Sequence, residues 1–318
     1  MPDWLTERGI GETRLVRFED GEIVEARILL DSVVRAGSVI EGRLMSSGSG
    51  SRNAVATALG GCEFLLPRGA LGTAEGASIR MEVTREVIPG SEPWKRPLAR
   101  VTDASVSDAA EQAAENVPFP SPTDRLGAAG WNDLIDEARS GIVRFPGGEL
   151  SIEATRAMTL IDADGLGAPE DLAVAGALAA ARAILRLDLQ GSIGIDLPTA
   201  SGKEARKRAV ETIDATLPQP FERTAVNGFG FVQIVRPRRR ASLVELAADR
   251  ASFEARALLR RAAFEEAGGA TLAANPRVVA VLEDHPDWIE ALSRQRGGPV
   301  GLRADASLAM SAGHVERV

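Results

Sequence analysis

Two aspartates in the middle of the chain, Asp162 and Asp196, end short apolar runs, and a long alanine-rich helical pattern separates them. A strand, a helix and a second strand in this order bring the carboxyl ends of both strands to one edge of a parallel sheet. Two carboxylates that meet there suit Mg²⁺, which binds proteins through one or two carboxylates and keeps several waters. A hydrated Mg²⁺ orients a water and stabilises negative charge on a reacting group. We therefore predict that Asp162 and Asp196 are Mg²⁺ ligands.

The composition excludes several other routes to catalysis. With one cysteine, Cys62, the chain forms neither an internal disulfide nor a cysteine-based zinc site, and we expect Cys62 to be a small buried residue. The two histidines, His285 and His314, both lie far along the chain, which argues against a Ser-His-Asp triad or a multi-histidine metal centre. Catalysis must then come from carboxylates, basic residues or a hard metal ion, which points again to the aspartates.

Residues 159–164 (TLIDAD), 183–188 (AILRLD) and 191–196 (GSIGID) carry a resemblance to a known family. Their order, the spacing between the two aspartates and the ending of the second apolar run resemble the catalytic core of the ribonuclease E/G family of endoribonucleases. The resemblance is specific in this stretch and looser elsewhere in the chain.

This resemblance implies a Mg²⁺-dependent endoribonuclease that hydrolyses single-stranded RNA to 5′-phosphate ends, in RNA processing or decay. It also implies an α/β chain of several parts, with an RNase H-like and DNase-I-like core, an inserted OB-type barrel and a small C-terminal α/β domain. The expected parts are residues 1–37 (N-terminal strands of the RNase H-like part), 38–92 (OB-type RNA-binding barrel), 93–147 (linker and remainder of the RNase H-like part), 148–240 (DNase-I-like catalytic part) and 241–318 (small domain).

Four positions depart from the family pattern. Asp164 stands where the family has an asparagine that orients the first metal ligand, and we expect it to act in the catalytic site as a third carboxylate. Gly228 replaces an arginine, while Gln233 and Arg156 replace glutamates. These changes leave a second function open, a catalytically weakened or inactive RNA-binding or regulatory descendant. A third option is an assembly factor that reaches RNA only through partners.

Basic and aromatic residues outside the acidic stretch are the expected RNA contacts. In the barrel, Phe64 is the candidate for base stacking and Arg43 for a backbone contact, although Phe64 also suits a barrel core. A basic helix over residues 201–217 corresponds to one that faces RNA in the family, and it suits a solvated helix face equally well. An arginine cluster follows the strand at 228–236 and is expected to substitute for the phosphate ligand lost at Gly228. The candidates in these two segments are Lys203, Arg206, Lys207, Arg236 and Arg238.

The remaining elements follow from periodicity and turn residues. Residues 12–35 predict a hairpin with its turn at 19–22, and residues 38–87 predict the short strands of a closed barrel. For the small domain we expect a helix over 243–266, a strand over 277–282, a helix over 287–296 and a short β-like tail.

The net charge of −8 argues against a protein that coats nucleic acid non-specifically, although a local basic groove remains compatible with it. Without an apolar run of membrane-spanning length, we expect a cytoplasmic protein that does not bind membranes. The expected partner is single-stranded or structured RNA. Because the cysteines of the family's zinc link are absent, we expect a monomer or dimer rather than a zinc-linked tetramer.

Overall fold

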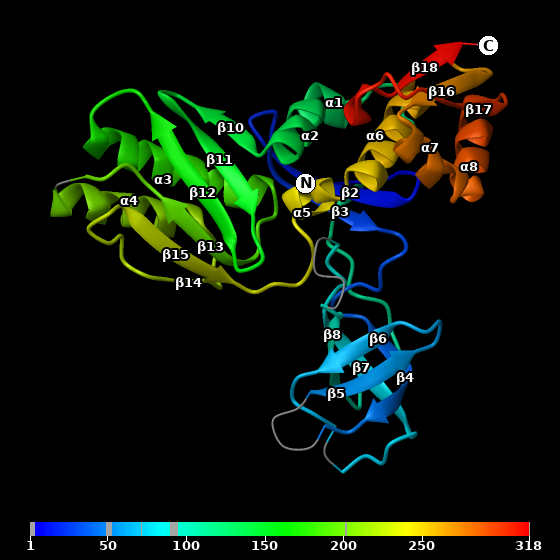
Figure 1. The fold of residues 1–318 in the computed structure, drawn as a ribbon, viewed down its shortest axis with the longest axis horizontal. Helices are drawn as coiled ribbons and strands as arrows, with labels where there is room; N and C mark the ends of the chain where they lie inside the picture. The colour runs from blue at the N-terminus through cyan, green and yellow to red at the C-terminus, as the bar shows by residue number, and fades with distance from the viewer. Residues whose placement is uncertain (1–3, 49–52, 71, 90–94, 201, 318) are drawn as a thin grey trace. The chain divides into compact units, whose positions relative to one another are not determined.

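The computed structural model describes residues 4–48, 53–70, 72–89, 95–200 and 202–317, which form a mixed α+β protein (Figure 1). The chain divides into two compact units. Unit 1 combines Met1–Ser32, Ala113–Arg139 and Leu246–Val318, and unit 2 combines Val33–Gln112 and Ser140–Glu245. The N-terminal strands and the C-terminal segment, which the sequence analysis assigned to separate parts, therefore belong to one unit. No helix of the described residues is long and apolar enough to cross a membrane.

A four-stranded sheet in the order β3-β2-β1-β9 forms one layer of unit 1. Its strands are β1 (Trp4–Arg8), β2 (Glu12–Glu19), β3 (Glu22–Leu30) and β9 (Glu115–Val117). The predicted hairpin is confirmed, because β2 and β3 pair antiparallel across the two-residue turn Asp20-Gly21. Both turn residues have positive φ, 52° and 85°, as the favoured two-residue hairpin turns require.

Helices and a small sheet complete unit 1. The helices are α1 (Arg125–Ala128), α2 (Trp131–Ser140), α6 (Arg250–Phe264), α7 (Pro276–Glu283), α8 (Pro286–Arg296) and the short 3₁₀ helix η1 (Met310–Ala312). The sheet has the order β17-β16-β18, formed by Val300–Ala304, Ala270–Ala274 and His314–Arg317. Apolar residues of α6, α7, α8 and β16 form a common buried core.

Two predictions for this segment are wrong. Residues 277–282 are helical, because Asn275 accepts a hydrogen bond from the backbone N–H of Arg277 and Pro276 opens α7. The helix expected over 243–266 is two helices, α5 (Leu243–Ala248) and α6, and Asp249 caps the second.

The first half of unit 2 is a closed five-stranded barrel in the order β4-β5-β6-β8-β7. The strands are β4 (Val39–Ser46), β5 (Ala54–Ala58), β6 (Glu63–Leu66), β7 (Ser78–Arg85) and β8 (Leu98–Val101). The predicted boundary at residue 92 is therefore too early, since β8 is needed to close the barrel. Cys62, expected to be buried, is exposed just before β6.

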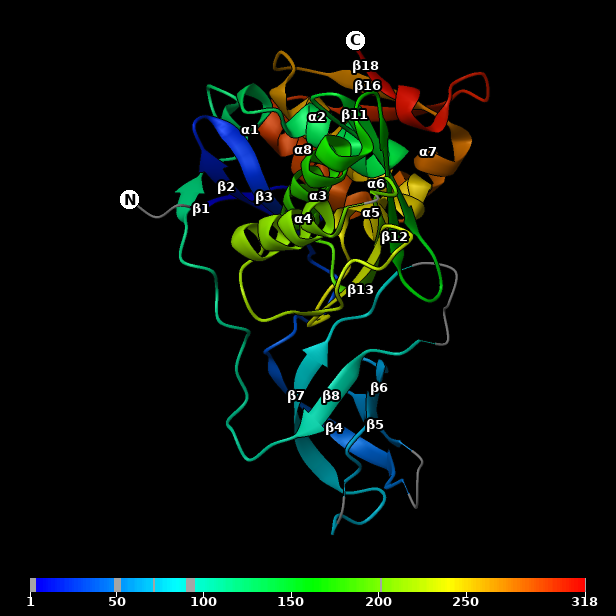
Figure 2. The same cartoon turned by 90° about the vertical axis from the view of Figure 1, so that its left-hand side faces the viewer.

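The second half of unit 2 is a six-stranded sheet in the order β10-β11-β12-β13-β15-β14. Its strands are β10 (Ile142–Phe145), β11 (Gly148–Ala154), β12 (Thr159–Gly165), β13 (Gly191–Asp196), β14 (Glu222–Arg223) and β15 (Phe231–Arg236). β12 and β13 are parallel, and the helix α3 (Pro169–Arg186) connects them. α3 packs against β10, β11 and β12, and α4 (Lys203–Thr216) lies beside α3 (Figures 1 and 2). Ser201, the predicted start of this second helix, lies outside the described residues.

Candidate functional site

The two aspartates singled out in the sequence lie side by side on neighbouring strands. β12 and β13 are parallel, and their register pairs Asp162 with Asp196. Residues paired in this way project from the same face of a sheet. The sequence prediction that strand, helix and strand would bring both carboxylates together is therefore confirmed in its geometry. Asp196 is the last residue of its strand, whereas Asp162 is followed by three more strand residues.

Alternation along β12 separates an acidic face from an apolar one. Ile161 and Ala163 are at most 2% exposed and lie on the face that α3 covers, while Asp162 and Asp164 project from the opposite face. A glycine in α3, Gly176, allows the close approach, since a Cβ there would lie 3.0 Å from the Ala163 methyl group. We call the other face, which carries Asp162, Asp164 and Asp196, the open face.

The three carboxylates of the open face raise one another's electrostatic energy. Partial burial, together with the negative charges of Asp164 and Asp196, raises the pKa of Asp162 above its ordinary value. Among the described residues, no lysine or arginine forms an ion pair with any of the three. Uncompensated negative charge at a point where two carboxylates meet is an arrangement that favours a divalent cation.

The carboxylates of the open face suit Mg²⁺, which keeps several water ligands, better than a metal ion whose ligands are all protein side chains. Within the described residues, no three Asp, Glu, His or Cys side chains converge closely enough to hold a metal ion. A pair of carboxylates is nevertheless what Mg²⁺ commonly uses when waters and substrate phosphate complete its octahedron. Asp162 and Asp196 fit such an ion, and Asp164 lies on the same face as a third acid.

Two helices begin beyond the strand ends that carry these acids. α3 follows β12 and α4 follows β13, and neither N-cap residue, Ala168 or Gly202, provides a side-chain cap. The first-turn N–H groups of both helices therefore have no side-chain acceptor at the cap, and N–H groups of this kind favour anions. Glu170 and Asp171 in the first turn of α3 counteract this preference, whereas α4 begins with Lys203.

The predicted RNA contacts in α4 differ in their availability. Lys203 is exposed in the first turn of the helix. Lys207 is exposed but lies 3.6 Å from Glu211 one turn later. Arg206 donates a hydrogen bond to the backbone carbonyl of Ala200, 2.7 Å away, and so holds the loop that leads into α4.

The arginines predicted to contact RNA, at and just after the end of β15, lie at the end of the sheet opposite to the acidic pair. β15 runs antiparallel to β13, so Arg236 pairs with Gly191 at the start of β13 rather than with Asp196 at its end. Five residues of strand separate the two positions, about 16 Å at 3.3 Å per residue. Arg236 donates to the carbonyl of Leu189 (2.9 Å), and Arg238 forms an ion pair with Glu245. Neither arginine is placed beside the acidic pair, because the direction of β15 carries them away from it.

The barrel residues predicted to bind RNA also divide into two cases. Phe64 is 1% exposed and belongs to the barrel core, so it offers no face to a base and that prediction is wrong. Arg43 is exposed on the outer surface of β4. The pattern of β6 explains the difference, because alternation directs Phe64 and Leu66 inward together.

Two exposed apolar residues at the edge where the acids lie were not predicted from the sequence. Leu166 is 91% exposed just after β12, and Phe229 is 82% exposed just before β15. Each stands between two glycines, in the tripeptides GLG and GFG. The available signal was the large apolar residue between two glycines. Leu166 follows β12, which carries two aspartates, and Phe229 precedes β15, which pairs with the aspartate-bearing β13.

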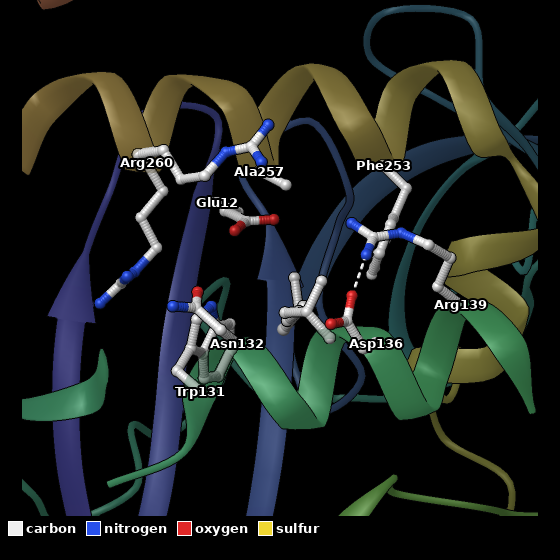
Figure 3. Close-up of a pocket in the computed structure, with 11 residues that line it drawn as sticks. Glu12, Trp131, Asn132, Asp136, Arg139, Phe253, Ala257 and Arg260 are labelled. Carbon is white, nitrogen blue, oxygen red and sulfur yellow. Dashed lines mark hydrogen bonds and ion pairs between the residues drawn. The ribbon is translucent and has the colours of Figure 1, made fainter. Parts of the chain in front are cut away.

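A separate cavity of about 200 Å³ lies within unit 1, between α2, α6 and the strands β2 and β3 (Figure 3). Most of the charged side chains that line it form ion pairs, several with buried residues behind the cavity wall. Arg260 binds Glu7 (3.0 Å), Arg256 binds Glu12 (3.0 Å), and Arg139 binds Glu254 (2.6 Å). Arg260 is 4% exposed and also lies over the Trp131 ring, at 5.8 Å from its centroid. Matched and buried charges of this kind indicate a structural network, so we place the candidate site on the open face of unit 2.

No family model matches this chain, and no curated protein matches it significantly.

Proposed function

We propose that this protein is a Mg²⁺-dependent endoribonuclease that hydrolyses single-stranded RNA and leaves 5′-phosphate ends, as a divergent relative of the ribonuclease E/G family. The observation that carries the proposal is the register of Asp162 and Asp196 on parallel strands, with both side chains on the open face. The motifs around them, which resemble that family, add independent support from the sequence.

In the proposed mechanism, Asp162 and Asp196 hold the metal ion, and Asp164 acts beside them. When bound, Mg²⁺ orients a water and neutralises charge on the scissile phosphate. The protein's own contribution is a fixed pair of carboxylates that repel each other until a cation binds, because both project from neighbouring strands of one sheet. Because the pKa of Asp162 is raised, protons compete with the metal ion for this carboxylate, and metal binding weakens as the pH falls.

Two exposed basic residues are the remaining candidates for contacts with the RNA backbone. Lys203 begins the helix that follows Asp196, and Arg43 lies on the surface of the barrel. The barrel supports RNA binding by its topology. Its first, second, third, fifth and fourth strands are neighbours in that order, which suits a five-stranded Greek-key barrel of the OB type.

One observation favours a second candidate function, an RNA-binding descendant without catalysis. Arg206, Arg236 and Arg238 are engaged with the protein itself. A site that has lost some of its phosphate contacts and holds only two in-register carboxylates suits such a protein as well.

The deciding experiment is cleavage of an end-labelled single-stranded RNA with and without Mg²⁺, by wild type and by Asp196→Asn. We expect Mg²⁺-dependent cleavage that falls at least about 100-fold in the variant, since even residues that only support metal ligands contribute about 10- to 100-fold. Glu222→Gln is the matched control, because Glu222 is an exposed carboxylate on β14 of the same sheet. RNA binding without cleavage in wild type would instead favour the non-catalytic descendant.

A further inference from the structure

Phe229 is a large aromatic residue whose ring is left in solvent, 82% exposed, at the edge of the sheet that carries the acids. Among the described residues it stacks on no other aromatic ring or guanidinium. The neighbouring Phe231 differs, since its ring lies against Gly194 of β13, where a Cβ would meet the ring at 2.6 Å. One of the two rings is thus part of the sheet surface, and the other is presented outward.

The backbone that presents Phe229 is held by specific contacts. The Asn227 side chain accepts hydrogen bonds from the N–H groups of Phe229 (2.9 Å) and Phe231 (3.1 Å). The Thr199 hydroxyl donates to the Phe229 carbonyl at 3.1 Å. Gly230 has φ +95°, and a Cβ there would lie 2.0 Å from the Leu197 carbonyl oxygen. The loop is therefore ordered against its neighbour, although the ring it carries is not buried.

These contacts tie Phe229 to the acidic pair. Phe231 pairs with Asp196 across the sheet, and the N–H of Leu197 donates to Gly230 at 3.2 Å. Phe229 thus lies two residues before Phe231, the residue opposite Asp196, and the Cα atoms of Phe229 and Phe231 are at most about 7 Å apart. A nucleotide spans a similar distance, so a ligand whose phosphate reaches the acidic pair has its base within reach of this ring.

We propose that Phe229 is the residue on which a base of the single-stranded RNA stacks while the RNA backbone lies at Asp162 and Asp196. This inference rests on the proposed function, because it assigns the ring to that substrate. Every base has a π face, so stacking on one phenyl ring contributes affinity without sequence preference.

Leu166 makes the proposal testable. It is equally exposed, at 91%, and is also flanked by glycines at the end of a strand that carries acids, but it has no π system. A contact that needs only apolar area would use both residues. A stacking contact needs Phe229 alone.

The experiment measures binding apart from cleavage, with a fluorescein-labelled single-stranded RNA of mixed sequence and Ca²⁺ in place of Mg²⁺. The proteins are the full chain as wild type, Phe229→Ala, Phe229→Trp and Leu166→Ala. We expect Phe229→Ala to weaken binding by about 5- to 150-fold, the range that base–aromatic stacking spans. Phe229→Trp should bind at least as tightly as wild type, and Leu166→Ala should change the dissociation constant less than about twofold. In the Mg²⁺ cleavage assay, Phe229→Ala should raise KM and leave kcat unchanged, because stacking contributes equally to the bound substrate and the transition state.

Each result separates this inference from the proposed function. Unchanged RNA binding by Phe229→Ala, in an enzyme that still cleaves, would overturn the stacking role and leave the nuclease standing. Equal losses in Phe229→Ala and Leu166→Ala would also overturn it, since they would identify a general apolar contact, such as one with a protein partner. Binding that depends on Phe229 without any cleavage would support stacking and overturn the nuclease. Absence of RNA binding in wild type would overturn both.

Discussion

At the scale of single residues, repulsion within the acidic pair lowers the stability of the folded protein. Asp162 and Asp196 are paired in register, and the charges of Asp164 and Asp196 act on Asp162 in addition to its partial burial. A site that binds a cation through uncompensated carboxylates must hold them together before the cation arrives. The proposed function and the stability of the fold are therefore opposed at this point.

Asp162→Asn should stabilise the protein at neutral pH in the absence of divalent ions. Partial burial, Asp164 and Asp196 raise the folded-state pKa of Asp162 above its unfolded value. A carboxyl shifted in this direction makes folding less favourable as the pH rises from the unfolded towards the folded pKa, and the cost stays constant above both. Because solvent screens the site, the gain should be below about 1 kcal/mol. Thermal unfolding in EDTA at pH 7 and at pH 3 checks this prediction, and a gain that is larger at pH 3 would contradict it.

At the scale of elements, local sequence signals predicted most helices and strands of unit 2, but not the relative directions of its strands. The β12–α3–β13 unit and the barrel strands of unit 2, like the β2–β3 hairpin of unit 1, were recognisable from alternation and turn residues. The position of Arg236 was not, because nothing in the strand itself shows that it runs antiparallel to β13. Phe64 was ambiguous for the related reason that the choice of inner and outer face depends on the closed barrel.

Helix α7 shows a second limit of local signals. Its sequence RVVAVL is rich in β-branched valine, which favours a strand. The cap Asn275-Pro276 and the burial of Val278, Val279 and Leu282 on one helical face prevail in the folded unit. Packing against α6 and the cap thus override a propensity that the sequence analysis followed.

Gly230→Ala should destabilise the loop that carries Phe229, whereas Gly228→Ala should not. Gly230 has φ +95° and no room for a Cβ beside the Leu197 carbonyl, while a Cβ at Gly228 meets nothing within 4 Å. We expect a loss of more than about 1 kcal/mol for the first and less than about 0.5 kcal/mol for the second. Urea unfolding followed by circular dichroism measures both. Equal effects at the two glycines would contradict the assigned geometry.

At the scale of the whole molecule, unit 1 depends on buried charges contributed by distant segments. Arg14 and Glu7 are each 1% exposed and lie 2.8 Å apart, and Arg260 of α6 binds both Glu7 and Asp124. Burial raises the pKa of Asp124, but hydrogen bonds from Arg260 and the Gly127 N–H outweigh it and leave that pKa below its ordinary value. The stabilisation from Asp124 is therefore present above its unfolded pKa and is lost as the pH falls through the folded one.

Glu7→Gln should destabilise unit 1 by about 3–5 kcal/mol, because it removes a carboxylate that Arg14 and Arg260 share. The buried arginines Arg14, Arg256 and Arg260 then have Glu12 and Asp124 as counter-charges among the described residues, two carboxylates for three guanidinium groups. Glu290→Gln is the control, since Glu290 and Arg294 form a pair at 3.9 Å with side chains 73% exposed, and its loss should be below about 0.5 kcal/mol. Tryptophan fluorescence during urea unfolding reports on unit 1 through Trp4, Trp131 and Trp288. Similar losses for the two variants would contradict the role assigned to the network.

The division of unit 1 into three stretches of chain has a consequence for synthesis on the ribosome. The strands β1 to β3 emerge first, yet Arg256 and Arg260, which neutralise Glu12 and Glu7, belong to α6, more than half the chain later. Unit 2 is complete by Glu245 and so can fold while the N-terminal strands still lack the cations of α6. Nascent chains that have released Glu245 from the ribosome, while α6 is still inside the exit tunnel, should therefore protect the barrel and the six-stranded sheet from protease and leave β1 to β3 open to cleavage.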